Sequence, residues 1–166
     1  MIEVREITSD QASLHKQLVL RGLMEDENCF RISPQDEEKQ NFPTTGQSDS
    51  FTMGAFDKNR LVGVASFKRD GSIRTKLRHK GILFKIYVAP EYRKKGIAKK
   101  MIEMIIERVT LIPDIEQINL TVIPTNKYAK AIYEEFGFKT FAFEEKAIKW
   151  KGKYFNEEQM KLILQK

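Results

Sequence analysis

The segment YVAPEYRKKGIAKKMIEMIIERV, residues 87–109, joins the end of an apolar strand to the start of an amphipathic helix. Residues 82–88 are apolar apart from Lys85, a pattern typical of a central strand. In the second half, apolar residues recur at helical spacing, which predicts a helix with one buried face. These residues are Ile97, Met101, Ile105 and Val109. The segment is therefore a βα crossover, with a sheet on one side and a covering helix on the other.

The start of this helix carries three cations and a glycine, Arg93-Lys94-Lys95-Gly96. Cations suit the other end of a helix, because the helix dipole is positive at the N-terminus. A bound phosphate would make them favourable, since it accepts from the unpaired N–H groups and its charge is offset by the cations. The alternative is a solvated basic turn with a structural glycine. The segment lacks both GxxxxGK[ST] and GxGxxG, so an NTPase or a dinucleotide fold is unsupported.

The rest of the chain alternates between strand and helix signals. Strands are predicted at residues 2–7, 51–56, 61–67, 82–88, 118–123, 138–144 and 160–164. One helix should follow the N-cap candidates Ser9 and Asp10 and end near Gly22, and a second should begin after the cap Ser33. A fourth helix should run from the cap Asn126 to Gly137. The expected class is α+β, a mixed, mostly antiparallel sheet of about six to seven strands flanked by about four helices.

Composition limits the class of protein without choosing a function. The 166 residues are 41% hydrophobic, which suits one globular domain over residues 1–166. The net charge of +6 permits an anionic partner but does not require one. The single cysteine, Cys29, excludes an intrachain disulfide and favours a reducing, cytoplasmic setting. No apolar run approaches the roughly 18 residues of a membrane span, so no membrane partner is expected.

Two blocks of the sequence resemble the GNAT N-acetyltransferases. The residues Arg93–Ala98, RKKGIA, are similar to the family's acetyl-CoA signature, R/Q-x-x-G-x-G/A. Residues 118–140 resemble a second block, with a strand, an Asn, a short helix, a Tyr and a Gly-Phe pair. The matching positions there are Asn126, Ala129, Tyr133, Gly137 and Phe138. The resemblance implies a GNAT-like α+β fold and an acyltransferase that moves the acetyl group of acetyl-CoA to a primary amine.

The same resemblance implies where acetyl-CoA binds. In the family, the sheet splays between the strands that match residues 82–88 and 118–123, and the pantetheine arm lies in the gap. Ile86, Tyr87 and Val88 would contact this arm, and the Val88 N–H would donate to the oxyanion. The pyrophosphate would be held by residues 93–99. These are Arg93, Lys94, Lys95, Gly96, Ile97, Ala98 and Lys99.

Tyr133 and Asn126 are the remaining candidates of the site. Tyr133 would donate a proton to the departing thiolate, which has a pKa near 8.5 if it resembles cysteine; without the resemblance it would be a core tyrosine. Asn126 would contact the cofactor or simply cap its helix. The proton of the acceptor amine needs a route that the sequence does not identify. The strand 82–88 contains no Asp or Glu, and His79 is a weak candidate base.

The acceptor stays open at this point. It would be a small-molecule amine or a peptide N-terminus, and acids at residues 25–27 and 36–38 could attract it unless they are ordinary solvated charges. No metal is expected. Two rival functions are an acetyl-CoA sensor without catalysis and a nucleic-acid binder that uses the basic segment 68–80, although this segment lacks interleaved aromatic residues. A homodimer fits the family, but nothing in the sequence decides it.

Overall fold

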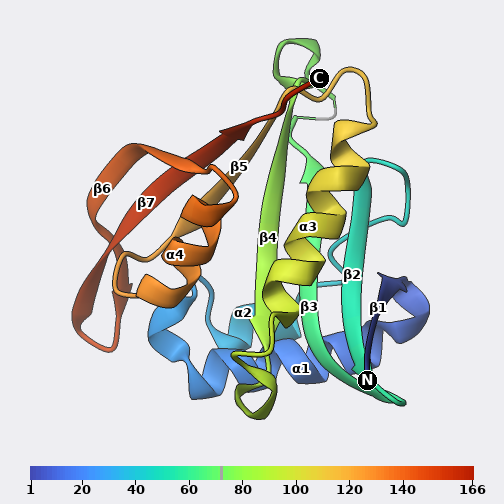
Figure 1. The fold of residues 1–166 in the computed structure, drawn as a ribbon. Helices are drawn as coiled ribbons and strands as arrows, with labels where there is room; N and C mark the ends of the chain where they lie inside the picture. The colour runs from blue at the N-terminus through green and yellow to red at the C-terminus, as the bar shows by residue number, and fades with distance from the viewer. Residues whose placement is uncertain (72) are drawn as a thin grey trace.

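A single mixed sheet organises the molecule (Figure 1). The computed structural model describes residues 1–71 and 73–166. Within them, seven strands follow the order β1-β2-β3-β4-β5-β7-β6. They are β1 Ile2–Ile7, β2 Ser50–Asp57, β3 Arg60–Arg69, β4 Lys80–Val88, β5 Gln117–Val122, β6 Lys139–Trp150 and β7 Lys153–Ile163. Neighbouring strands are antiparallel except β4 and β5, which are parallel. The predicted α+β class with a mixed sheet is confirmed.

Helices cover both faces of the sheet. Figure 1 shows α3 and α4 on one face and α1 and α2 on the other. Their bounds are α1 Ala12–Glu25, α2 Pro34–Glu38, α3 Ile97–Thr110 and α4 Lys127–Glu135. The predicted stripe of α3 is fully buried: Met101, Ile105 and Val109 have no exposed surface. Across the described residues, no helix combines the length and the apolar character that a membrane crossing needs.

The parallel strands β4 and β5 separate after a short stretch of pairing. Only Lys80–Ile82 of β4 pairs with β5, opposite Gln117–Asn119. Figure 1 shows the two strands close together near the C-terminus of the chain and apart at their other ends. The β5-facing backbone groups of β4 beyond Ile82 therefore lack a strand partner. An unpaired edge inside a sheet is available to a ligand that can supply the missing hydrogen bonds.

The predicted boundaries of the first helix are wrong at both ends. Ser9 belongs to a short 3₁₀ helix, and α1 begins at Ala12. At the other end, α1 passes through Gly22 and continues to Glu25. A Cβ atom at Gly22 would lie 2.7 Å from the ring of Tyr87, so this glycine lets the helix pack closely on β4. Its role is close packing, which overrides the low helix propensity of glycine.

The C-terminal hairpin is longer than the sequence indicated. Residues 145–149 and 153–159 belong to β6 and β7, and only a two-residue turn at Lys151 and Gly152 separates the strands. Both turn residues have positive φ, 49° and 77°, as a tight hairpin turn requires. The pairing shifts between Glu144 and Ile148, which marks an irregularity in β6. This irregularity disturbs the alternation of apolar and polar residues that reveals a strand.

Candidate functional site

A bulge interrupts β4 where it has left β5. The pairing with β3 runs from Ser66 opposite Phe84 to Val64 opposite Tyr87, so Lys85 and Ile86 both lie opposite one residue of β3. Lys85 takes a positive φ of 50° to make this bulge. The bulge changes the direction of the strand next to its unpaired edge, a place where bulges commonly redirect side chains. Ile86 and Val88 face the core under α3, and Tyr87 faces α1.

The end of β4 presents the Val88 N–H to the gap between β4 and β5. The next residue, Ala89, donates its N–H to the Val62 carbonyl of β3. Successive N–H groups of a strand point to opposite edges, so the Val88 N–H points away from β3. The Val88 carbonyl accepts from Arg93 Nε at 2.9 Å on the same side. This orientation agrees with the expectation that Val88 donates to an oxyanion.

The turn between β4 and α3 forms a cradle of backbone N–H groups. Lys94 and Gly96 have positive φ, 60° and 76°, and such alternating backbone turns successive N–H groups toward one point. The first hydrogen bond of α3 is donated by Lys100 to the Gly96 carbonyl, so the amides of residues 97–99 have no partner within the helix. The cradle therefore combines the positive end of a 14-residue helix with freely oriented donors, which suits a phosphate.

A cavity adjoins this cradle. It has a volume of about 380 Å³ and is lined by Gly96, Lys99, Lys100, Glu103, Glu135 and Phe136, between the start of α3 and the end of α4. Lys99 forms an ion pair with Glu135 at 2.6 Å across this space. A larger hollow of about 730 Å³ lies between α1 and the β2–β3 turn, beside Leu14, Arg21 and Asn59. The smaller cavity borders the cradle, so it is the candidate for a phosphate site.

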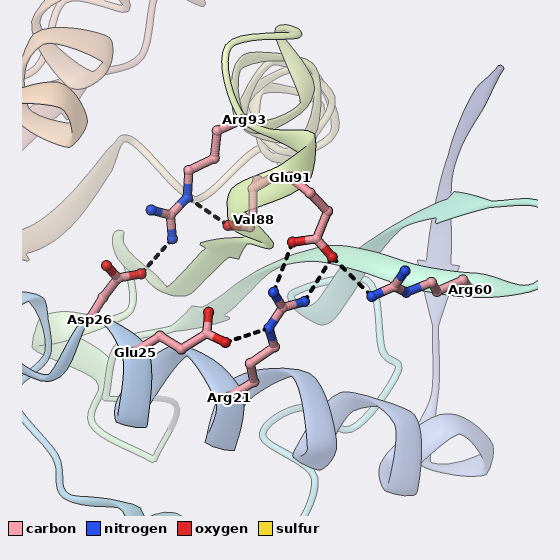
Figure 2. A network of polar contacts seen from close by, with 7 residues as sticks. All are labelled: Arg21, Glu25, Asp26, Arg60, Val88, Glu91 and Arg93. Carbon is pink, nitrogen blue, oxygen red and sulfur yellow. Dashed lines mark hydrogen bonds and ion pairs between the residues drawn. The ribbon is translucent and has the colours of Figure 1, made fainter.

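The Arg93 side chain is turned toward the protein. Its Nη2 lies 2.5 Å from Asp26 Oδ2, at the end of α1, and its Nε holds the Val88 carbonyl. Figure 2 shows Arg93 between α1 and the end of β4. The side chain therefore links the end of α1 to the strand and the turn of the candidate site. A contact from Arg93 to phosphate stays a prediction.

A second group of ion pairs anchors the same turn (Figure 2). Glu91 accepts two hydrogen bonds from Arg21, at 2.9 and 2.8 Å, and one from Arg60 at 2.9 Å. Arg21 also binds Glu25 at 2.9 Å. The hydrogen bonds from Arg21 lower the pKa of Glu91 to about 2, so this carboxylate is ionised at neutral pH. The turn before the cradle is thus held by α1 on one side and β3 on the other.

Tyr133 and Asn126 lie on and before α4. The Tyr133 side chain is buried, belongs to the same core cluster as Val88, and meets Phe138 edge to face at 6.0 Å. Burial raises the pKa of Tyr133 well above its usual value near 10, so the hydroxyl keeps its proton. Asn126 accepts from the Ala129 N–H at 3.3 Å and therefore caps the helix, as predicted. A contact between Asn126 and a cofactor stays a prediction.

The α1 and α2 side of the sheet is not a free acidic surface. Asp26 is paired with Arg93, and Glu27 binds Trp150 Nε1 and Lys151 Nζ in the β6–β7 turn. Glu37 is buried and binds Lys85 Nζ at 2.7 Å. Cations therefore pair with Asp26, Glu27 and Glu37, three of the six carboxylates that could attract an amine, and Arg21 pairs with a fourth, Glu25. Lys85 was detectable in the sequence as a charge inside an apolar strand, but its partner Glu37 had no such signal.

Two further sequence candidates are displaced from the gap. His79 directly precedes β4, which begins at Lys80. Val88, at the other end of β4, lies eight residues beyond Lys80, which is roughly 26 Å along the strand. It is therefore too far from Val88 to act as a base there. Arg69 of the basic segment is buried and binds Asp49 at 2.7 Å and Asp114 at 3.0 Å. This residue holds loops together, which weakens the nucleic-acid interpretation. Among the described residues, no His, Cys, Asp or Glu cluster could hold a metal.

Comparisons with known proteins identify a family. Residues 18–138 match the model of the acetyltransferase (GNAT) family. No curated protein sequence matches the chain at a significant level. The matched range contains β2–β5, the cradle, α3 and α4, and so includes the first sequence block and the five matching positions of the second.

Solved structures share the whole fold. An acetyltransferase of the GNAT family from Streptococcus pneumoniae has a TM-score of 0.80 at 18% identity, with 99% of this chain and 100% of that chain covered. A putative acetyltransferase from Salmonella typhimurium, solved with its cofactor acetyl-CoA, has a TM-score of 0.81 at 13% identity, covering 100% and 95%. The ribosomal-protein-S18-alanine N-acetyltransferase from Escherichia coli has a TM-score of 0.75 at 15% identity, covering 100% and 96%.

Proposed function

Because the chain belongs to the GNAT acetyltransferase family, we propose that it transfers the acetyl group of acetyl-CoA directly to a primary amine. One observation carries this proposal. The strands β4 and β5 part beyond Ile82, and the amide cradle at the start of α3 lies beyond the end of β4. A long ligand with a phosphate at one end and a hydrogen-bonding arm at the other fits this combination. Acetyl-CoA has both parts.

The residues present fit this ligand. Ile86, Tyr87 and Val88 would hold the pantetheine arm along the unpaired edge of β4, and residues 94–99 would bind the pyrophosphate through backbone N–H groups. Gly96 leaves open space, since a Cβ atom there would meet nothing within 4 Å. The cations Lys94, Lys95 and Lys99 would offset the phosphate charge. Bound acetyl-CoA supplies an activated acetyl group, and the Val88 N–H would stabilise the negative charge that develops on its carbonyl oxygen.

Tyr133 would serve as the general acid for the departing sulfur. Its raised pKa keeps the hydroxyl protonated, so it would donate to the sulfur as the carbon–sulfur bond breaks. The acceptor must also lose protons. For a lysine-like amine of pKa near 10.4, deprotonation at pH 7 costs about 4–5 kcal/mol. The acceptor would be a small-molecule amine or a peptide N-terminus. The named substrate of the Escherichia coli structure, a protein alanine, is one example of this class. A cytoplasmic location and a homodimer stay predictions.

The experiment is a measurement of thiol release from acetyl-CoA with a panel of primary amines. Tyr133→Phe should lower kcat by roughly 10–1,000-fold, because thiolate is already a fair leaving group and acid catalysis adds a moderate factor. Tyr128→Phe is the matched control, since Tyr128 lies on the same helix and is exposed. A folded Tyr133→Phe variant with the rate of the wild type would contradict the role of Tyr133. Acetyl-CoA binding without turnover on any amine would favour the sensor function instead.

A further inference from the structure

Three carboxylates are buried in the described part of the chain, Glu37, Glu157 and Glu158, and one of them differs from the others. Glu37 binds Lys85, whose own side chain is only 13% exposed. Glu158 accepts from Lys130 at 3.0 Å and from Thr140 at 2.8 Å. The Oε2 atom of Glu157 is buried without a hydrogen-bond donor from any described residue. A buried acceptor left without a donor is costly, so it points to a missing partner.

The partner that Glu157 does have is exposed and poorly aligned. Arg31 Nε lies 2.8 Å from Glu157 Oε2, but the contact does not meet the geometry of a hydrogen bond. The Arg31 side chain is 63% exposed, whereas that of Glu157 is 3% exposed. Glu144 of β6 is paired directly opposite Glu157, and two carboxylates at such positions repel each other. The site is therefore suited to a better-aligned cation that takes the place of Arg31.

Glu157 and Tyr133 lie on opposite sides of the sheet. Its neighbour Glu158 contacts α4 through Lys130, and adjacent residues of a strand face opposite sides. Glu157 thus faces the side of α1 and α2, and Arg31 reaches it from the segment between these helices. Tyr133 is on α4 and packs into the core on the opposite side of the sheet, with residues of α3. A base must contact the amine nitrogen and an acid must contact the sulfur, so these two groups can come from different sides of the gap.

The strand register places Glu157 near the parting of β4 and β5. Val122, the last residue of β5, is opposite Glu158, so Glu157 lies just beyond the end of β5. The β4–β5 pairing ends with Ile82 opposite Asn119. Lys85 is three residues beyond Ile82 on β4, and Val122 is three residues beyond Asn119 on β5, so the two residues are about level along the parallel strands. Glu157 is therefore at the height of the β4 bulge, across the gap from the strand that would hold the thioester.

We propose that Glu157 is the catalytic carboxylate of the acceptor site, which binds the protonated primary amine in place of Arg31 and then takes a proton from it. The proposal rests on the proposed acetyl transfer and names its base. The amine nitrogen forms a bond to the acetyl carbon, and the carbon–sulfur bond breaks. The nitrogen loses two protons: the sulfur receives the proton of Tyr133, one nitrogen proton restores Tyr133, and the other leaves through Glu157 to water.

The test compares wild type with Glu157→Gln, with butylamine as the probe because it offers a primary ammonium and no other polar group. Calorimetry with acetyl-CoA alone comes first and should give the same affinity for both proteins. Butylamine is then added at high concentration and thiol release is followed from pH 6 to 9. At pH 7, kcat/KM for butylamine should fall about 100-fold or more in Glu157→Gln, within the range of acid–base catalysis. Glu145→Gln, an exposed glutamate in the same hairpin, should have no effect.

The pH profile separates a base from a structural residue. If Glu157 binds the ammonium form, kcat/KM of the wild type is flat over this range, because the reacting forms are a carboxylate and a protonated amine. Glu157→Gln can use only the free amine, so its rate should rise about tenfold per pH unit toward the amine pKa near 10.4. Equal rates at every pH, or a loss that is the same at every pH, would overturn the proposal.

Arg31→Met supplies a second, independent variant. Arg31 competes with the amine for Glu157, so its removal should lower the KM for butylamine without lowering kcat. A KM that rises would show that Arg31 binds the acceptor and would overturn the exchange of Arg31 for the amine. A wild type that binds no acetyl-CoA in calorimetry would contradict the proposed function itself, before any amine is added.

Discussion

Replacing Gly96 by alanine should weaken acetyl-CoA binding far more than it weakens the fold. Gly96 has φ of 76°, and a Cβ atom there would point into open space, with nothing within 4 Å. The added methyl group therefore meets no protein atom. It would occupy the space from which a phosphate approaches the N–H groups of residues 94–99.

The cost to the fold follows from the backbone angle alone. An L residue in the left-handed region loses about 1–2 kcal/mol relative to the right-handed one. The lower entropy of the unfolded alanine chain offsets about 0.4–1 kcal/mol of this. We expect a loss of about 1 kcal/mol in the free energy of unfolding, or a fall of about 2–4 °C in Tm for a chain of this length. The Kd for acetyl-CoA should rise about tenfold or more, which corresponds to about 1.4 kcal/mol.

Gly46 offers a matched control. Its φ is 78° and a Cβ atom there would also meet nothing within 4 Å, but it lies in the loop before β2. Gly46→Ala should therefore lose the same stability and keep the acetyl-CoA affinity of the wild type. Urea unfolding and calorimetry measure the two quantities separately. Gly96→Ala and Gly46→Ala with the same Kd as the wild type would refute the close approach of phosphate to this turn.

Two further predictions concern stability. Arg69→Met should lower the free energy of unfolding by about 3 kcal/mol in urea, because the buried guanidinium holds Asp49 and Asp114, and a loss below 0.5 kcal/mol would contradict this. Burial, with Lys85 and Lys16 nearby, lowers the pKa of His15 from 6.5 to about 4, so the unfolded chain binds the proton first as the pH falls. The contribution of neutral His15 to the free energy of unfolding is present above pH 6.5, and about 3 kcal/mol should be lost as the pH falls toward 4. His15→Leu should flatten this dependence, and an unchanged slope would show that His15 is not its source.

Strong periodicity made most of the fold predictable. The buried stripe of α3, the alternation in β1 and the caps Ser33 and Asn126 are local signals, and each element lies where its signal placed it. The end of α1 was not predictable, because the packing of Gly22 against Tyr87 is a contact between segments far apart in the sequence. Local propensity favours a helix end at this glycine, and the tertiary contact outweighs it.

The candidate site also has parts that follow from local sequence and parts that depend on contacts between distant segments. The spacing of the glycine and cations predicted a phosphate cradle, because a helix start and its turn are contiguous in sequence. The bulge at Lys85 depends on pairing with β3, and the position of Glu157 depends on a hairpin whose irregular strand hides its length. The contact of Arg93 with phosphate stays a prediction, but the pairing of its guanidinium with Asp26, a residue 67 positions earlier, had no signal in the sequence. Sequence spacing cannot reveal such partners.

The measurement that tests the central claim most directly is a titration of the ¹⁵N-labelled protein with acetyl-CoA, followed by NMR of the backbone amides. The account predicts that the largest shifts occur at residues 86–88 and 94–99, on both sides of the β4–α3 turn. Shifts confined to the hollow between α1 and the β2–β3 turn, at residues such as Leu14 and Asn59, would contradict the assigned site. The absence of any shift at saturating acetyl-CoA would contradict the proposed acetyl transfer.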